Sequence, residues 1–193
     1  MQSIRSIKII IGFVCVLFIA TIIGCATGGG LNVPLTNYKP MLAGDYDVYK
    51  GQRVYLMNFE NEANDTTMWA YLSPDKKISY SNNNVLQNYF WYAFNNAFTN
   101  VGMLVSRMDN PDLTAPAMWV TLLSITDVNY QVSVTIQRKG VTVFTQKYGI
   151  QESPLPEKDS TPTALEERAY KMTNNLISTI LKDQGFKKAL AGA

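Results

Sequence analysis

Residues 130–148, YQVSVTIQRKGVTVFTQKY, carry the clearest secondary-structure pattern of this chain. Val132, Val134 and Ile136 alternate with polar side chains, which is typical of a strand with one buried face. Lys139-Gly140 then forms a two-residue turn, and the apolar residues after it predict a returning strand. This hairpin indicates an antiparallel sheet.

Runs of strand-forming residues before the hairpin predict further strands at 53–59, 103–106 and 117–126. The apolar spacing over 85–101 predicts an amphipathic helix, with Asn82-Asn83-Asn84 as its caps. A second helix begins at the capping-box pair Thr163 and Glu166 and ends at Gly185. The expected fold is α+β, with an antiparallel four- to five-stranded sheet and two helices packed on one face.

The N-terminus has the features of an export signal. Arg5 and Lys8 precede an apolar run of about 15 residues, which is shorter than the roughly 20 that a bilayer-spanning helix needs. The run ends in Gly24-Cys25, and residues 22–25 resemble a bacterial lipobox. The resemblance implies that residues 1–24 are a cleaved signal peptide and that Cys25 carries diacylglycerol and an N-acyl chain. Ala26 after this cysteine implies sorting to the outer membrane. The alternative is an uncleaved membrane anchor.

The amino-acid composition argues against several classes of function. The chain has 17 basic residues, 15 acidic residues and no histidine, and the two basic residues of the signal leave the remainder with no net charge. A neutral domain has no clustered charge for nucleic acid. Without histidine it also lacks the commonest general base and transition-metal ligand. With Cys15 in the signal and Cys25 acylated, no disulfide is expected.

The predicted domain organisation has three parts. After the signal peptide, residues 25–51 contain the acylated Cys25, Gly28-Gly29-Gly30 and two prolines, a composition that predicts a flexible tether. Residues 52–193 then form a single periplasmic α+β domain.

No motif for catalysis stands in a supporting context. Ser73 and Lys76 match the Ser-x-x-Lys pattern of penicillin-recognising enzymes, but Pro74 and Asp75 between them predict a turn instead of a helix. Paired acidic residues, such as Asp109 and Asp112, lack the spacing of a calcium loop. The sequence therefore predicts a protein that is not an enzyme and has no metal or other cofactor.

The first helix and its flanks are unusual because they contain no charged residue between Lys77 and Arg107. On a helical wheel, Tyr89 and Tyr92 fall on the outer side. Charge depletion together with exposed aromatics is typical of an interface. Three flanking aromatic residues extend this predicted interface: Trp69, Tyr71 and Tyr80. The alternative is a helix covered by its own domain, and Trp119 is expected in the core in either case.

Taken together, these elements resemble small proteobacterial envelope lipoproteins, most closely the YajG family. The similar features are Val85-Leu86-Gln87 at the start of the first helix, the hairpin within 132–149 and the last helix, which runs to Phe186. A related resemblance is to the auxiliary lipoproteins of MCE-type lipid transporters. These resemblances imply a lipid-anchored partner-binding or assembly module on the periplasmic side of the outer membrane. The alternative is a lipid or glycan carrier, or an auxiliary subunit of an envelope lipid transporter.

Overall fold

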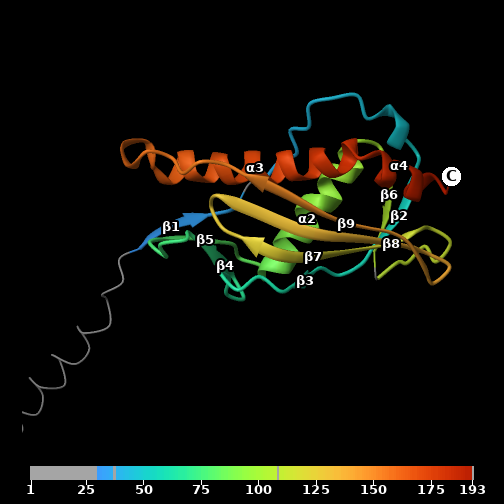
Figure 1. The fold of residues 1–193 in the computed structure, drawn as a ribbon, viewed down its shortest axis with the longest axis horizontal. Helices are drawn as coiled ribbons and strands as arrows, with labels where there is room; N and C mark the ends of the chain where they lie inside the picture. Colours follow the sequence, from blue (N-terminus) through green and yellow to red (C-terminus); the bar gives the residue numbers. More distant parts are fainter. Residues whose placement is uncertain (1–29, 37, 108, 193) are drawn as a thin grey trace, which may run out of the picture. The chain divides into compact units, whose positions relative to one another are not determined.

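The computed structural model describes residues 30–36, 38–107 and 109–192, and the folded unit begins at Leu31. The predicted signal peptide, its cleavage site at Gly24 and the lipidated Cys25 lie outside the described residues. The fold is a mixed α+β arrangement with two sheets and three α-helices among the described residues (Figure 1).

The large sheet contains the predicted hairpin at one edge. Its strands run in the order β6-β2-β7-β8-β9, and β3 also pairs with β7. Their bounds are β2 (Arg53–Leu56), β3 (Glu60–Asn61), β6 (Leu104–Ser106), β7 (Ala117–Ile125), β8 (Asn129–Arg138) and β9 (Val141–Gln151).

The expectation of an entirely antiparallel sheet is wrong. β7, β8 and β9 form an antiparallel meander, but β2 is parallel to both of its neighbours, β6 and β7. A long connection, which includes α2, joins β2 to β6, and a crossover of this kind brings the second strand back in the same direction.

A second, three-stranded sheet was not predicted. It contains β1 (Leu31–Pro34), β5 (Ile78–Ser81) and β4 (Ala70–Leu72), in that order. The tether predicted for residues 25–51 is therefore too long, because the chain from Leu31 onward belongs to the fold. Val33, Leu35 and Tyr49 are almost fully buried, and the Tyr49 hydroxyl donates to the Leu181 carbonyl oxygen at 2.5 Å. A short 3-10 helix, η2 (Asp47–Tyr49), ends this segment.

In the described part of the chain, three α-helices are found where two were predicted: α2 (Leu86–Asn100), α3 (Pro162–Lys182) and α4 (Gln184–Ala191). α3 follows the 3-10 helix η3 (Glu157–Asp159) and is capped by Thr161, whose Oγ1 accepts from the Ala164 amide at 3.2 Å. Asp183, and not Gly185, ends the long helix. Its carboxylate accepts from the Phe186 amide at 2.8 Å and so caps α4.

The core lies between the helices and one face of the large sheet. Val132, Val134 and Ile136 are fully buried on that face, as predicted, and they pack in one cluster with the buried residues of α2 and α3. The alternate residues of β7 and β8 point to the opposite face. Trp119 is one of them and is partly exposed, so its expected place in the core is wrong.

Candidate functional site

The exposed side of α2 is a stripe of uncharged residues. Eight of its residues are buried, and the exposed positions recur at a spacing of three or four, which places them in one line on the helix surface. We call this line the α2 stripe, and its members are Asn88, Tyr92, Asn96, Thr99 and Asn100. Tyr92 is the one aromatic residue of the stripe, with 44% of its surface exposed.

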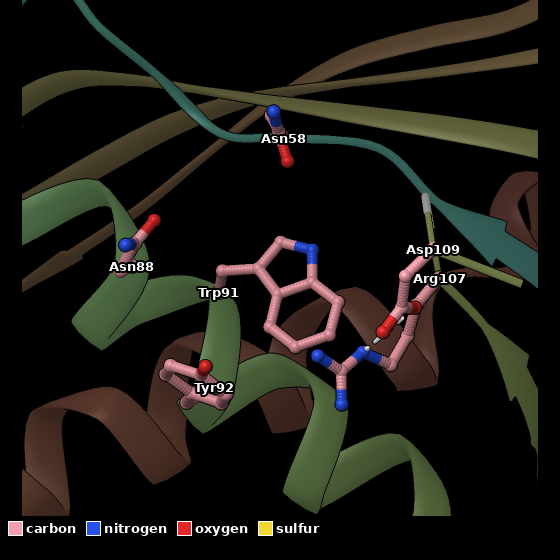
Figure 2. Close-up of a pocket in the computed structure, with 6 residues that line it drawn as sticks. All are labelled: Asn58, Asn88, Trp91, Tyr92, Arg107 and Asp109. Carbon is pink, nitrogen blue, oxygen red and sulfur yellow. Dashed lines mark ion pairs between the residues drawn. The ribbon is translucent and has the colours of Figure 1, made fainter.

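A shallow hollow of about 210 Å³ lies on one side of Tyr92 (Figure 2). Trp91 forms its centre, and Asn58 and Asn88 face the ring from two sides. The guanidinium of Arg107 lies 5.4 Å from the indole centroid, a cation–π distance, and its Nε is 3.5 Å from Asp109 Oδ1. These two contacts hold Arg107 at the rim of the hollow.

The Trp91 side chain is itself fixed from two sides. Its Nε1 donates to the Leu56 carbonyl oxygen at 3.4 Å, which ties the ring to β2. The Tyr92 ring packs edge-on against it, with centroids 5.2 Å apart and planes at 90°. This arrangement leaves the phenol of Tyr92 standing between two depressions.

The second depression, of about 180 Å³, lies on the other side of Tyr92. Amide side chains dominate its polar lining, from Asn82 and Asn84 before the helix and from Asn96 within it. Amides offer both donors and acceptors without a net charge, so this surface can hydrogen-bond to a partner with little desolvation of charge.

Of the five residues predicted for the interface, only two are exposed. Tyr92 belongs to the α2 stripe and Trp69 is 49% exposed, whereas Tyr71, Tyr80 and Tyr89 are buried. The prediction is therefore wrong for these three tyrosines.

Tyr89 is buried because α2 is covered on a second side. Tyr38, Tyr170 and Thr173 surround its phenol, and burial raises the pKa of the hydroxyl well above its ordinary value. The segment that contains Tyr38 was predicted to be tether. The helical wheel assumed that only the sheet covers α2, and it therefore predicted that Tyr89 is exposed to solvent.

Tyr71 and Tyr80 are buried because they join the two sheets. Their rings stack with centroids 4.7 Å apart, and Tyr71 Oη lies 2.5 Å from Tyr130 Oη in β8. Burial raises the pKa of the Tyr71 hydroxyl, with the neighbouring Tyr130 as a further cause. These side chains hold the small sheet against the core and do not face a partner.

The Ser-x-x-Lys pattern, which the sequence offered as a catalytic motif, belongs to a local turn. The Ser73 hydroxyl donates to Asp75 Oδ1 at 2.6 Å and accepts from the Ile78 amide, so it stabilises a turn and is not paired with Lys76. The same bond holds the pKa of the Asp75 carboxyl below its usual range. Across the described residues, no three His, Cys, Asp or Glu side chains are grouped as a metal site requires.

Comparisons with known proteins identify the fold but no function. No family model and no curated protein matches the chain. The structure is similar to that of XCC0632 from Xanthomonas campestris, a protein described by the family model DUF330, with a TM-score of 0.61 and 4% sequence identity. The match covers 82% of this chain and 98% of that one. A weaker match, to an uncharacterised protein, has a TM-score of 0.43 and 10% identity, and covers 75% and 97% of the two chains.

Within the described part of the chain, none of the helices has the length and apolar character needed to span a bilayer. The described residues have a fold similar to that of XCC0632. The α2 stripe is the candidate interaction surface.

Proposed function

We propose that this protein is a non-enzymatic lipoprotein, anchored through Cys25 to the periplasmic side of the outer membrane, and that its α2 stripe binds another envelope protein. The observation that carries the proposal is the exposed Tyr92 in a surface line without a charged side chain. Interface centres are depleted in charge and enriched in tyrosine, and an ordinary solvent-facing helix is not.

The geometry around Tyr92 suits an energetic centre of such an interface. The phenol has few rotatable bonds to order on binding and lies between two depressions that can receive partner side chains. Arg107, held against Trp91 and Asp109, supplies a preorganised donor at the rim. A charged residue at the rim steers a partner more than it adds affinity.

The lipid on Cys25 would serve as a tether. Confinement of the domain to a membrane surface raises its effective concentration for a partner in the same envelope, so a modest interface suffices. The likeness to the YajG family and to the auxiliary lipoproteins of MCE-type transporters agrees with this role and is part of the proposal.

The alternative, a lipid or glycan carrier, has less support. A lipid carrier needs an apolar cavity that takes up most of its ligand. The space between α2 and the sheet is instead filled by large side chains, of which Phe90, Phe94 and Phe98 are fully buried. The two depressions beside Tyr92 are small and lined mainly by polar groups.

Substitution of Tyr92 tests the binding proposal. Tyr92→Glu places a charge at the centre of the stripe without entering the core, so the domain should fold normally. The full chain would be cross-linked in gently solubilised membranes, and its protein partners would be quantified by mass spectrometry. We expect Tyr92→Glu to lose a partner that Tyr92→Phe retains. Equal recovery of every partner with both variants would contradict the proposal.

The anchor requires its own experiment. Cys25→Ser removes the thiol that accepts the lipid, and we expect the variant to leave the membrane fraction. Retention of Cys25→Ser in carbonate-washed membranes would support an uncleaved anchor instead. This result would leave the α2 stripe untouched.

A further inference from the structure

β9 is an edge strand with no neighbouring strand on its outer side among the described residues, where the Gln146 side chain donates to the Lys147 carbonyl oxygen at 3.2 Å. It pairs with β8 alone, and the Glu152 amide donates to the Val128 carbonyl oxygen at 2.9 Å. Hydrogen-bonded and non-hydrogen-bonded pairs alternate along an antiparallel ladder. Because Glu152 bonds to Val128, the even-numbered residues from 144 to 150 also hydrogen-bond to β8. Thr145, Lys147 and Gly149 therefore direct their N–H and C=O groups away from the sheet.

The open side of β9 faces a groove whose other wall is helical. α3 runs beside β9 (Figure 1). A hollow of about 450 Å³ lies between residues 149–152 and the polar face of α3 at Asn175, Ser178 and Lys182, and Met41 and Ala43 from the segment before η2 also line it. A second hollow, of about 310 Å³, lies between Val143 and α4. The two hollows lie beside the two ends of the strand.

The groove is lined by cations. Three basic residues line its two hollows, namely Arg138, Lys182 and Lys188, and Lys147 belongs to β9 itself. Neither nearby acid is free, because Glu152 is within 4 Å of Arg168 and Lys171, and Asp183 caps α4. Lys147, Lys182 and Lys188 have no ion-pair partner among the described residues.

We propose that this groove, the β9 groove, binds an extended acidic segment of another protein, which adds to the large sheet as a strand beside β9. Backbone pairing would supply affinity, and the cations would select acidic side chains. A second copy of this chain is a poor occupant, because pairing β9 with its own copy would oppose two clusters of like charge. The β9 groove and the α2 stripe use different residues, so either can fail alone.

A synthetic peptide of alternating Glu and Val tests the proposal on the full chain in detergent micelles. We expect it to bind and to slow hydrogen exchange over residues 141–151, because the outward amides would become paired. The same peptide with Lys in place of Glu should bind about tenfold or more weakly, owing to repulsion by the groove.

N-methylation of the Glu–Val peptide separates backbone pairing from charge attraction. Methyl groups on one set of alternate amides block the bonds to β9, and on the other set they point outward. We expect one methylated peptide to lose binding and the other to retain it. Equal binding of both peptides would overturn the proposal.

A variant of the chain gives an independent check. Lys147→Pro removes one outward N–H without taking a hydrogen bond from the β8–β9 ladder, and Lys147→Ala removes the charge but keeps the N–H. We expect about tenfold weaker peptide binding for Lys147→Pro than for Lys147→Ala, since a backbone hydrogen bond is lost and the edge is blocked. If Lys147→Pro does not fold, the methylated peptides decide.

The alternative ligand of these cations is the headgroup of an anionic lipid. Addition of phosphatidylglycerol to the micelles distinguishes lipid headgroups from acidic peptides. We expect it to leave exchange over residues 141–151 unchanged. Protection of that strand by the lipid, with no protection by the Glu–Val peptide, would assign the groove to headgroups and overturn the proposal.

Discussion

α2 and α3 pack in the same core, yet they differ in their caps and in the charge of their exposed residues. α3 has the features of an ordinary surface helix: a cap at Thr161, Pro162 in its first turn and Lys182 in its last. α2 begins after Val85 with no side-chain cap and has no charged residue at all. The expected capping asparagines do not reach it, since Asn82 instead bonds to the Asn84 amide.

The difference shows what holds each helix in place. Local signals contribute to α3, whereas α2 depends on tertiary packing of its aromatic face, because an uncapped and uncharged segment of this length is marginal alone. The exposed side chains of α2 are uncharged, so they do not stabilise the helix through ion pairs. In the proposed function, these are the positions that contact the partner.

The largest expected effect is the loss of a core aromatic from α2. Phe94 is fully buried, with ring centroids 5.1 Å from Phe59 and 5.7 Å from Phe98. We expect Phe94→Ala to lower the free energy of unfolding by about 3–5 kcal/mol in urea titrations. Asn96→Ala, on the exposed side of the same helix, should change it by less than about 0.5 kcal/mol. Similar values for the two variants would contradict the packing account.

Tyr71 and Tyr80 provide a matched pair that tests their assignment to the interior. Tyr71→Phe removes the hydrogen bond between the buried Tyr71 and Tyr130 hydroxyls and should cost about 1–3 kcal/mol in thermal or urea unfolding. The Tyr80 hydroxyl is buried without a hydrogen-bond partner among the described residues, so Tyr80→Phe should be neutral or stabilising. A reversed order would show that these side chains are arranged differently.

Removal of the α3 cap tests the local contribution. We expect Thr161→Ala to reduce the free energy of unfolding by about 1 kcal/mol, because the Ala164 amide loses its acceptor. Thr161→Ser keeps the hydroxyl and should stay close to the wild type. If Thr161→Ala has no effect, α3 depends on packing as much as α2 does.

The smallest effect concerns buried charge beside α3. Asp127 is buried, and desolvation raises its carboxyl pKa despite the nearby Arg168. The folded state thus favours the protonated acid, and stability falls as the pH rises through the range in which Asp127 ionises. We expect Asp127→Asn to be more stable than the wild type at pH 7, with the difference shrinking below about pH 4. A difference that is independent of pH would exclude this cause.

How much the sequence could predict depends on how local each signal is. The β7–β9 meander, α2 and the start of α3 were predictable because alternation and helical spacing lie within short segments. The small sheet was not, because β1 pairs with β5 across a long stretch of chain that contains β2, β3 and β4.

The same distinction between local patterns and tertiary contacts applies to the candidate site. Tyr92 was found because the lack of charge is visible in the sequence, and the spacing of Asn88, Tyr92 and Asn96 could have identified the whole stripe. The burial of Tyr89 could not be predicted while the segment covering it was assigned to the tether. Stacking of Arg107 on Trp91 is a tertiary contact that no local pattern specifies.

Site-specific photo-cross-linking in cells tests the central claim most directly. A photoreactive phenylalanine would replace Tyr92 on α2 and, as the matched control, the exposed Glu167 on α3. We predict a single discrete protein adduct from position 92 that is absent from position 167. No adduct at position 92, or the same adducts at both positions, would contradict the assignment of the α2 stripe as the binding surface.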